Sequence, residues 1–288
     1  MTSQSEENLI KILSTESRNL KNLITNIKQI TKYINNNPPE NGENLHKIKS
    51  EVNKIEKTLK QSKLDDFIKN KVEEELQPIR AQLPEWEERL KRNFGQQLEK
   101  KLNEELGFQL KGHYPKLKAG FYTIDVNIDN NTVGIWYGPE QEKLDKAKMD
   151  IDMVIDKLKK IHTQITGREL NNNLFLKNIY DAYKSLVIRE GKSIGDEIQI
   201  TNILLEYALS IQSSRFRRDP VKNHYTSYGR VYFSYDLYRL KERIIDDHEL
   251  SLITAPRALT QSRSEFLWIP FNESGDGNYI SHIIFKPV

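Results

Sequence analysis

A cluster of basic side chains is the feature of this sequence whose residue types and spacing best suit a chemical role. Residues 215–222 hold four cations opposed only by Asp219: Arg215, Arg217, Arg218 and Lys222. Cationic side chains neutralise phosphates, and nearby tyrosines can hydrogen-bond phosphates or stack on bases. We therefore predict that this segment binds nucleic acid.

Three further arginines extend the predicted basic face. Arg230 follows in the same stretch, and Arg257 and Arg263 lie in a loop between two predicted strands. A structural interpretation competes with this one, because cations at a helix end complement its dipole and tyrosines in a sheet are commonly core residues or cross-strand partners. The sequence leaves both interpretations open.

Two motifs that would bind phosphate or calcium fail on spacing. Residues 191–193 read Gly-Lys-Ser, as a phosphate loop ends, but Leu186 stands where that loop requires glycine. Oxygen-bearing side chains alternate over residues 125–129 as in a calcium loop, yet the turn glycine is replaced by Asn130 and the closing carboxylate by Trp136. A helix end and a strand's outer face explain these patterns better.

Neither a metal site nor a catalytic group is indicated. The chain has no cysteine, and its six histidines are scattered, with no pair at the spacing that places two ligands on one helix face. We predict no cofactor, no metal and no catalytic residue. One alternative remains, an enzyme with a dispersed site that uses residues of one loop: His224, Tyr225, Tyr228 and Arg230.

Composition points to long exposed helices. Charged residues make up 30% of the 288 residues and apolar residues only 37%, where about 45% would be ordinary. The net charge of +3 is too small to indicate a general attraction to polyanions, so only local clusters carry that prediction. Because no targeting or membrane-spanning segment is evident, we expect a cytoplasmic protein without a membrane partner.

The N-terminal third predicts a helical hairpin. One helix face carries a seven-residue repeat of apolar residues that we expect to bind a partner helix: Leu13, Leu20, Ile27 and Ile34. Helix breakers over residues 35–42 predict a reversal, and the pattern resumes over residues 45–59. This is typical of an antiparallel coiled-coil hairpin, within the chain or between chains. A separate helix should follow from Pro84 to residue 106.

The rest of the chain predicts a mixed α/β region, so that the fold class is α+β with domains at residues 1–106 and 107–288. We expect a β-hairpin over residues 119–138, helices within 141–213, the first starting at residue 141, and an antiparallel C-terminal sheet over 228–288. The stretch NESGDGN should join the last two strands, and a winged-helix-like arrangement would make it the wing.

Together these features favour a non-enzymatic assembly or adaptor protein. It would oligomerise or dock through the coiled coil and bind DNA or RNA through the basic, tyrosine-rich segment. The alternative is a pure protein-interaction scaffold, in which the arginines pair with an acidic protein surface. Binding to nucleic acid would weaken steeply with salt, which separates the two hypotheses.

Overall fold

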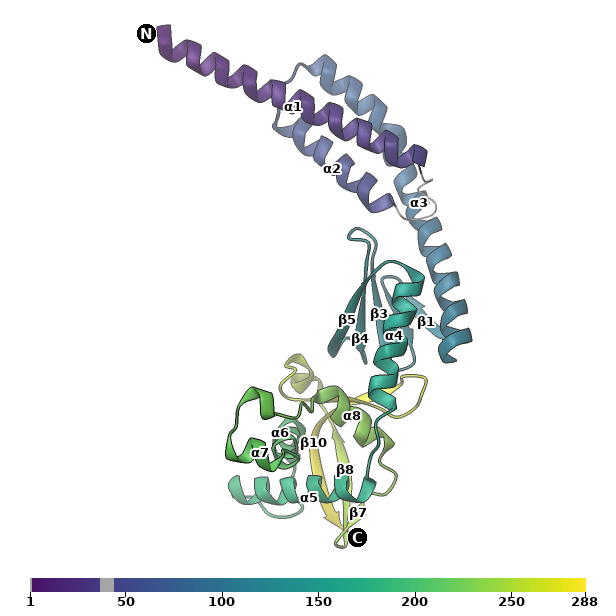
Figure 1. Cartoon of the computed structure of the whole chain (residues 1–288), viewed down its shortest axis with the longest axis vertical. Coiled ribbons are helices and arrows are strands. Elements are labelled where there is room, and N and C mark those ends of the chain that lie inside the picture. Colours follow the sequence, from purple (N-terminus) through teal and green to yellow (C-terminus); the bar gives the residue numbers. More distant parts are fainter. Residues whose placement is uncertain (1, 37–43) are drawn as a thin grey trace. The chain divides into compact units, whose positions relative to one another are not determined.

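The computed structural model describes the backbone of residues 2–36 and 44–288, and shows a mixed α+β chain with long N-terminal helices and antiparallel sheets (Figure 1). The chain divides into two compact units. Unit 1 comprises Met1–Lys101, Val126–Val133 and Lys148–Ile151, and unit 2 comprises Leu102–Asp125, Gly134–Ala147 and Asp152–Val288.

Two paired helices begin unit 1. α1 (Thr2–Asn36) packs against α2 (Leu45–Gln61), because both carry apolar residues at alternating spacings of three and four. The pair is antiparallel: the Asn44 side chain donates to the Tyr33 carbonyl at one end, and the Lys63 amide donates to Glu16 at the other. Most of the predicted reversal, residues 37–42, lies outside the described residues.

The third helix is longer than the sequence predicts. α3 (Asp66–Leu106) continues through both Pro78 and Pro84, whereas the sequence predicts that a separate helix starts at Pro84. Each proline removes one backbone donor, but the helix buries Leu76 and Trp86 on either side of Pro84. Burial of these side chains opposes the break that the prolines favour.

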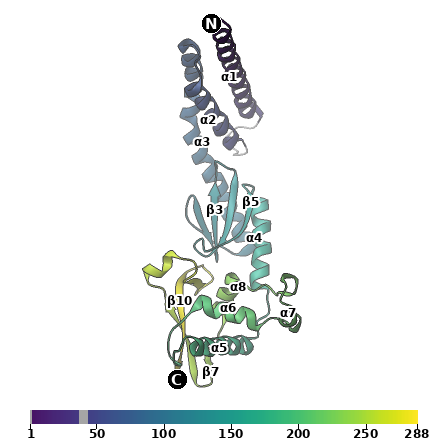
Figure 2. The same ribbon diagram turned by 90° about the vertical axis from the view of Figure 1, so that its left-hand side faces the viewer.

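A five-stranded sheet follows, in which neighbours in sequence are neighbours in space. Its strands are β1 (Leu110–His113), β2 (Lys116–Ala119), β3 (Tyr122–Asn127), β4 (Thr132–Tyr137) and β5 (Glu142–Lys148). Strands β3 and β4 form the hairpin predicted over residues 119–138, with Asn131 at a φ of 51° in its turn. Figures 1 and 2 show α4 (Ile151–Thr166) covering one face of this sheet.

The helix predicted from residue 141 was wrong at its start, because residues 142–148 form strand β5. Leu144 and Ala147 fit the spacing of a helix, but β4 offers this segment a row of strand hydrogen bonds. Pairing with a neighbouring strand overrides a weak local preference. The helix therefore begins only at Ile151.

The C-terminal part of unit 2 surrounds a second antiparallel sheet, in the order β6-β10-β8-β7, with β9 also paired to β10. These strands are β6 (Ile198–Gln199), β7 (Ile244–Ile245), β8 (His248–Thr254), β9 (Leu267–Pro270) and β10 (Gly277–Pro287). The helical elements are α5 (Asn172–Arg189), α6 (Ile200–Ser210), α7 (Ser214–Arg218), α8 (Arg230–Arg239) and the short 3-10 turns η2 (Lys222–His224) and η3 (Arg257–Gln261).

The structure also corrects the prediction for the tyrosine-rich segment. Residues 230–239 form helix α8, not the start of the sheet predicted over 228–288. Phe233 and Leu237, spaced by four, are completely buried on one face of this helix. The strand prediction rested on the high density of aromatic residues in this stretch, whereas their burial follows the helical period.

The NESGDGN stretch does join β9 and β10, as predicted. It packs against the turn between β2 and β3, since a Cβ atom on Gly275 would lie 1.8 Å from the Gly120 carbonyl oxygen. A wing would instead project from the fold. Within residues 2–36 and 44–288, none of the helices has the length and apolar composition of a transmembrane span.

Candidate nucleic-acid interface

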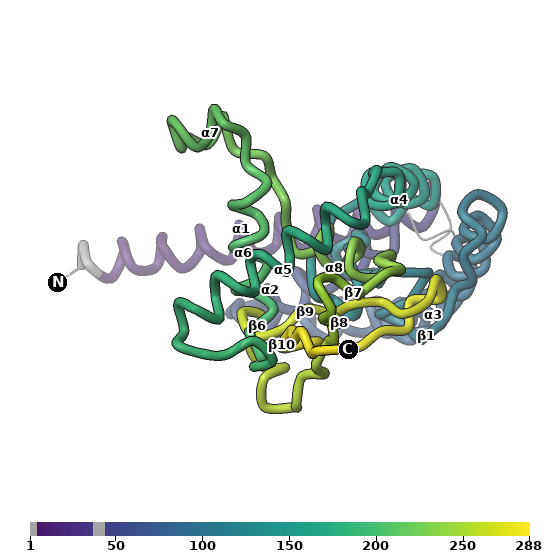
Figure 3. Tube along the Cα trace, turned by 90° about the horizontal axis from the view of Figure 1, so that it is seen from below, coloured from purple at the N-terminus to yellow at the C-terminus, as the bar shows by residue number. Residues whose placement is uncertain are grey.

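The basic segment, residues 213–225, follows α6 in unit 2 and contains α7 and η2. Figure 3 shows α7 at the far end of a stretch that extends away from α5 and α6. Ser213 starts α7, because its Oγ accepts a hydrogen bond from the Phe216 amide at 3.2 Å. The segment thus begins with a defined helix cap.

A single buried glutamine closes the base of the basic segment. The Gln212 Oε1 accepts from the Thr226 amide at 2.8 Å, and its Nε2 donates to the carbonyls of Thr226 at 3.0 Å and Ala208 at 2.5 Å. Gln212 is only 4% exposed. These bonds hold the two ends of the segment together and attach them to α6.

Contacts within the segment, and one contact with the end of α6, also order it. The rings of Phe216 and Tyr225 lie 5.5 Å apart between centroids, and Arg217 Nη2 donates to the Ser210 carbonyl at 2.6 Å. The His224 Nδ1 lies 3.0 Å from the carbonyl oxygen of Asp219 and 3.5 Å from its Oδ2. The cations are therefore carried on an ordered backbone.

Charge on the segment is strongly unbalanced. Four cations face one carboxylate, that of Asp219, which lies beside His224. Arg215, Arg218 and Lys222 are exposed, and the structure shows no ion pair for them in the part of the chain it describes. These three side chains are free to meet an anion from solution.

Two of the other predicted cations are neutralised elsewhere. Arg230 Nε lies 2.5 Å from Oε1 of Glu142, and Arg263 Nη2 lies 2.6 Å from Oε2 of the same side chain. Arg230 also donates to the Phe266 carbonyl at 2.6 Å. Arg257 is exposed on η3. The described contacts link none of the three to the basic segment, so the candidate interface consists of its four cations.

A buried charge cluster around Asp236 was not predicted from the sequence. Its carboxylate is 1% exposed, accepts from Tyr228 Oη at 2.6 Å, and pairs with Arg168 at 2.8 Å and Arg239 at 2.8 Å. The Arg168 guanidinium also lies 4.2 Å from the centre of the Tyr232 ring. The only sign of this cluster in the sequence is that Asp236 and Arg239 are three residues apart, the spacing of an ion pair on one helix, and that spacing does not predict burial.

Most of the nearby tyrosines belong to the core, not to a stacking platform. Burial, with Asp236 beside it, raises the pKa of Tyr228 far above its ordinary value, and burial raises the pKa of Tyr207 to about 12. Their rings lie 4.9 Å apart. Tyr225, at 40% exposed, belongs to the basic segment and can reach a ligand.

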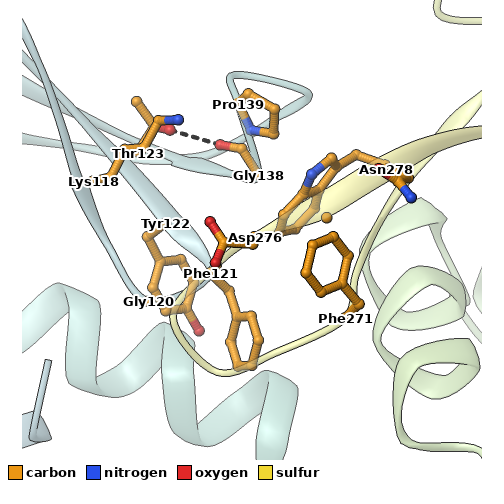
Figure 4. Close-up of a pocket in the computed structure, with 13 residues that line it drawn as sticks. Lys118, Gly120, Phe121, Tyr122, Thr123, Gly138, Pro139, Phe271, Asp276 and Asn278 are labelled. Carbon is orange, nitrogen blue, oxygen red and sulfur yellow. Dashed lines mark hydrogen bonds between the residues drawn. The ribbon is translucent and has the colours of Figure 1, made fainter. Parts of the chain in front are cut away.

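A hollow of about 340 Å³ lies between the β2–β3 turn and the β9–β10 loop (Figure 4). Thr123 Oγ1 donates to the Gly138 carbonyl at 2.7 Å, and the Asp276 carboxylate accepts from Asn272 Nδ2 at 2.9 Å. Two polar side chains that line the hollow, Thr123 and Asp276, are therefore already hydrogen-bonded within the protein. Among the described residues there is also no cluster of three or more potential metal-ligating histidines or carboxylates.

The predicted partner-binding repeat on α1 is largely uncovered. Leu13 is 60% exposed and Ile27 is 37% exposed, while Leu20 and Ile34 are half-buried. The side chains that α1 buries fully lie on a neighbouring stripe, at Leu23 and Ile30. The hairpin with α2 therefore leaves the repeat available to another partner.

Gln212→Ala tests the closure of the basic segment. We expect the free energy of unfolding to fall by about 1–3 kcal/mol, because the part-buried amide and carbonyl of Thr226 and the buried carbonyl of Ala208 lose their bonds with Gln212. Urea denaturation measures the change, and hydrogen exchange at the Thr226 amide should accelerate. Gln261→Ala, at an exposed position, is the control and should change stability by less than about 0.5 kcal/mol. Equal effects of the two substitutions would contradict the assignment.

In comparisons with known proteins, no family model, no curated protein and no solved structure matches this chain.

Proposed function

We propose that the protein is a non-enzymatic assembly protein that binds nucleic acid through the basic segment and self-associates through α1 as a coiled coil. The single observation that supports the binding role is the set of exposed cations without described ion pairs: Arg215, Arg218 and Lys222. A phosphate backbone is the ligand that unpaired, closely spaced cations fit best.

Order in the segment strengthens this proposal. Gln212 fixes both ends, and the Phe216–Tyr225 contact holds α7 against the chain that follows η2. A preorganised set of cations loses less conformational entropy on binding than a flexible basic tail. Tyr225 adds an aromatic ring beside the cations, as single-stranded nucleic acid would require for stacking.

A protein scaffold is the second candidate function, and one observation favours it. Val221, at 43% exposed, lies next to Lys222 on the same segment. An apolar side chain among cations suits an acidic protein surface with an apolar centre as well as it suits nucleic acid. The two functions differ in how they respond to salt and to the chemistry of the ligand.

Fluorescence anisotropy with short double-stranded and single-stranded DNA and RNA, across a salt series, tests the proposal. The test variant carries Arg215→Ala, Arg217→Ala and Arg218→Ala together. We expect its affinity to fall at least tenfold at low salt. The slope of log affinity against log salt should flatten by about 0.9 for each duplex phosphate that the variant no longer neutralises.

A charge-matched control separates the segment from net charge. Lys177→Ala, Lys241→Ala and Lys286→Ala also remove three exposed cations from unit 2, outside the basic segment. This control should bind like the wild type. If both triple variants weaken binding equally, the attraction is diffuse and the proposed interface is wrong. If the wild type does not bind at low salt, the scaffold function takes its place.

A further inference from the structure

α1 carries two apolar stripes, and its hairpin with α2 uses only one of them. The inner stripe contains Leu23 and Ile30, both 2% exposed. The outer stripe follows the alternating spacing of three and four, with Ser17 between its first and second halves: Ile10, Leu13, Leu20, Ile24 and Ile27. Four of its members are exposed, from 37% at Ile27 to 65% at Ile10, and Leu20 is half-buried. A sustained stripe of this spacing is the seam of a two-helix coiled coil.

The outer stripe matches itself when reversed. Placing Ile10 opposite Ile27 of a second copy also places Leu13 opposite Ile24, and Ser17 opposite Leu20. Each layer then joins residues of the two seam positions, as an antiparallel coiled coil requires. The stripe from residue 10 to residue 27 spans about 26 Å at 1.5 Å per residue.

The distribution of charge along α1 also favours an antiparallel pair. Residues 5–16 hold three carboxylates, Glu6, Glu7 and Glu16, against one lysine, Lys11. Residues 17–36 hold no carboxylate and four cations: Arg18, Lys21, Lys28 and Lys32. An antiparallel pair sets each acidic half beside a basic half, whereas a parallel pair sets like charges together.

We infer that α1 pairs with α1 of a second copy of this chain, antiparallel, through the outer stripe. This inference rests on the proposed self-association and specifies its partner, its direction and its register. The hairpin with α2 is retained, since α2 covers the inner stripe. Two copies would then present two basic segments to one nucleic acid.

A charge exchange at one layer tests both partner and direction. Leu13→Glu and Ile24→Lys should each weaken self-association at least tenfold in sedimentation velocity of the full chain, because each homodimer buries two charges against apolar side chains. Mixing the two variants should restore association, since one layer then pairs Glu with Lys and the other stays wild type. In a parallel dimer residue 13 faces residue 13, so mixing would remove the like-charge contacts but leave both charges against apolar side chains, and wild-type association would not return.

Controls for folding use the same charges elsewhere on the helix. Asn22→Glu and Thr25→Lys lie at exposed positions off the outer stripe and should associate like the wild type. At a protein concentration where the wild type is monomeric, all four variants should keep the wild-type urea midpoint. A wild type that stays monomeric into the high micromolar range, or a mixture that associates no better than its components, overturns the inference.

Cross-linking reads the register directly, because the chain has no cysteine of its own. Under mild oxidation, a mixture of Ile10→Cys and Ile27→Cys should form a disulfide-linked dimer, while each variant alone should not. Cross-linking of either variant with itself would contradict the antiparallel register.

Neither the sedimentation assay nor the cross-linking assay contains nucleic acid, so the two proposals can fail separately. A monomeric wild type that still shows arginine-dependent DNA binding would remove self-association alone, whereas a dimer without DNA affinity would remove the nucleic-acid function alone.

Discussion

Asp236→Ala is expected to lower the free energy of unfolding by about 3–5 kcal/mol, the largest effect that we expect from removing a charge among the described residues. The Asp236 carboxylate is 1% exposed and joins Arg168, Arg239 and the Tyr228 hydroxyl. Its removal leaves two partly buried guanidinium groups and a buried hydroxyl without their shared acceptor. Urea or thermal denaturation followed by circular dichroism measures the decrease in stability.

An exposed ion pair of the same spacing provides the comparison. Asp181 pairs with Lys184 at 2.9 Å, three residues apart, but the two side chains are 51% and 40% exposed. Asp181→Ala should therefore lower stability by less than about 1 kcal/mol, since water screens the pair. Similar decreases for the two substitutions would show that Asp236 is solvated in the folded protein.

Among glycine-to-alanine substitutions in unit 2, we expect Gly275→Ala to lower the free energy of unfolding most. Gly275 has a φ of 82°, and its added Cβ would lie 1.8 Å from the Gly120 carbonyl oxygen, so backbone must move. Positive φ alone costs an alanine about 1–2 kcal/mol. Displacement of the β9–β10 loop also weakens its packing, and we expect a total above about 3 kcal/mol by denaturation.

Gly191→Ala separates backbone strain from steric overlap. Gly191 also has a positive φ, 65°, but nothing lies within 4 Å of an added Cβ. This variant should show only the conformational part of the destabilisation, about 1–2 kcal/mol. If Gly275→Ala costs no more than Gly191→Ala, the loop adjusts freely and its close approach to Gly120 contributes little.

The spacing of apolar residues correctly predicted those helices and hairpins whose pattern lies within a single segment of the sequence. The α2 positions Leu45 and Ile48 repeat at helical spacing and are fully buried. The β3–β4 turn follows from two asparagines between alternating strands. In α1 the repeat was recognised, but the buried stripe is the neighbouring one, because two adjacent stripes satisfy the same spacing and only α2 decides between them.

The remaining misassignments come from partners outside the misassigned segment, a neighbouring strand in one case and a distant part of the core in the other. Residues 142–148 become a strand because β4 is adjacent, and residues 230–239 become a helix because Phe233 and Leu237 enter a core built from several other elements. Charge spacing predicted the exposed cations at residues 215–222. It could not show that Arg230 and Arg263 share Glu142, since these ion pairs join positions up to 121 residues apart, from Glu142 to Arg263.

The Gln212 closure has a consequence for how this protein can vary. Its amide fixes both ends of residues 213–225, while the cations between them lie in solvent. Substitutions at Arg215, Arg218 and Lys222 are therefore nearly neutral for folding, and selection on ligand preference is separated from selection on stability. A lineage could exchange the charges of this segment, or graft another sequence of equal length between the same two anchors, without rebuilding the core beneath it.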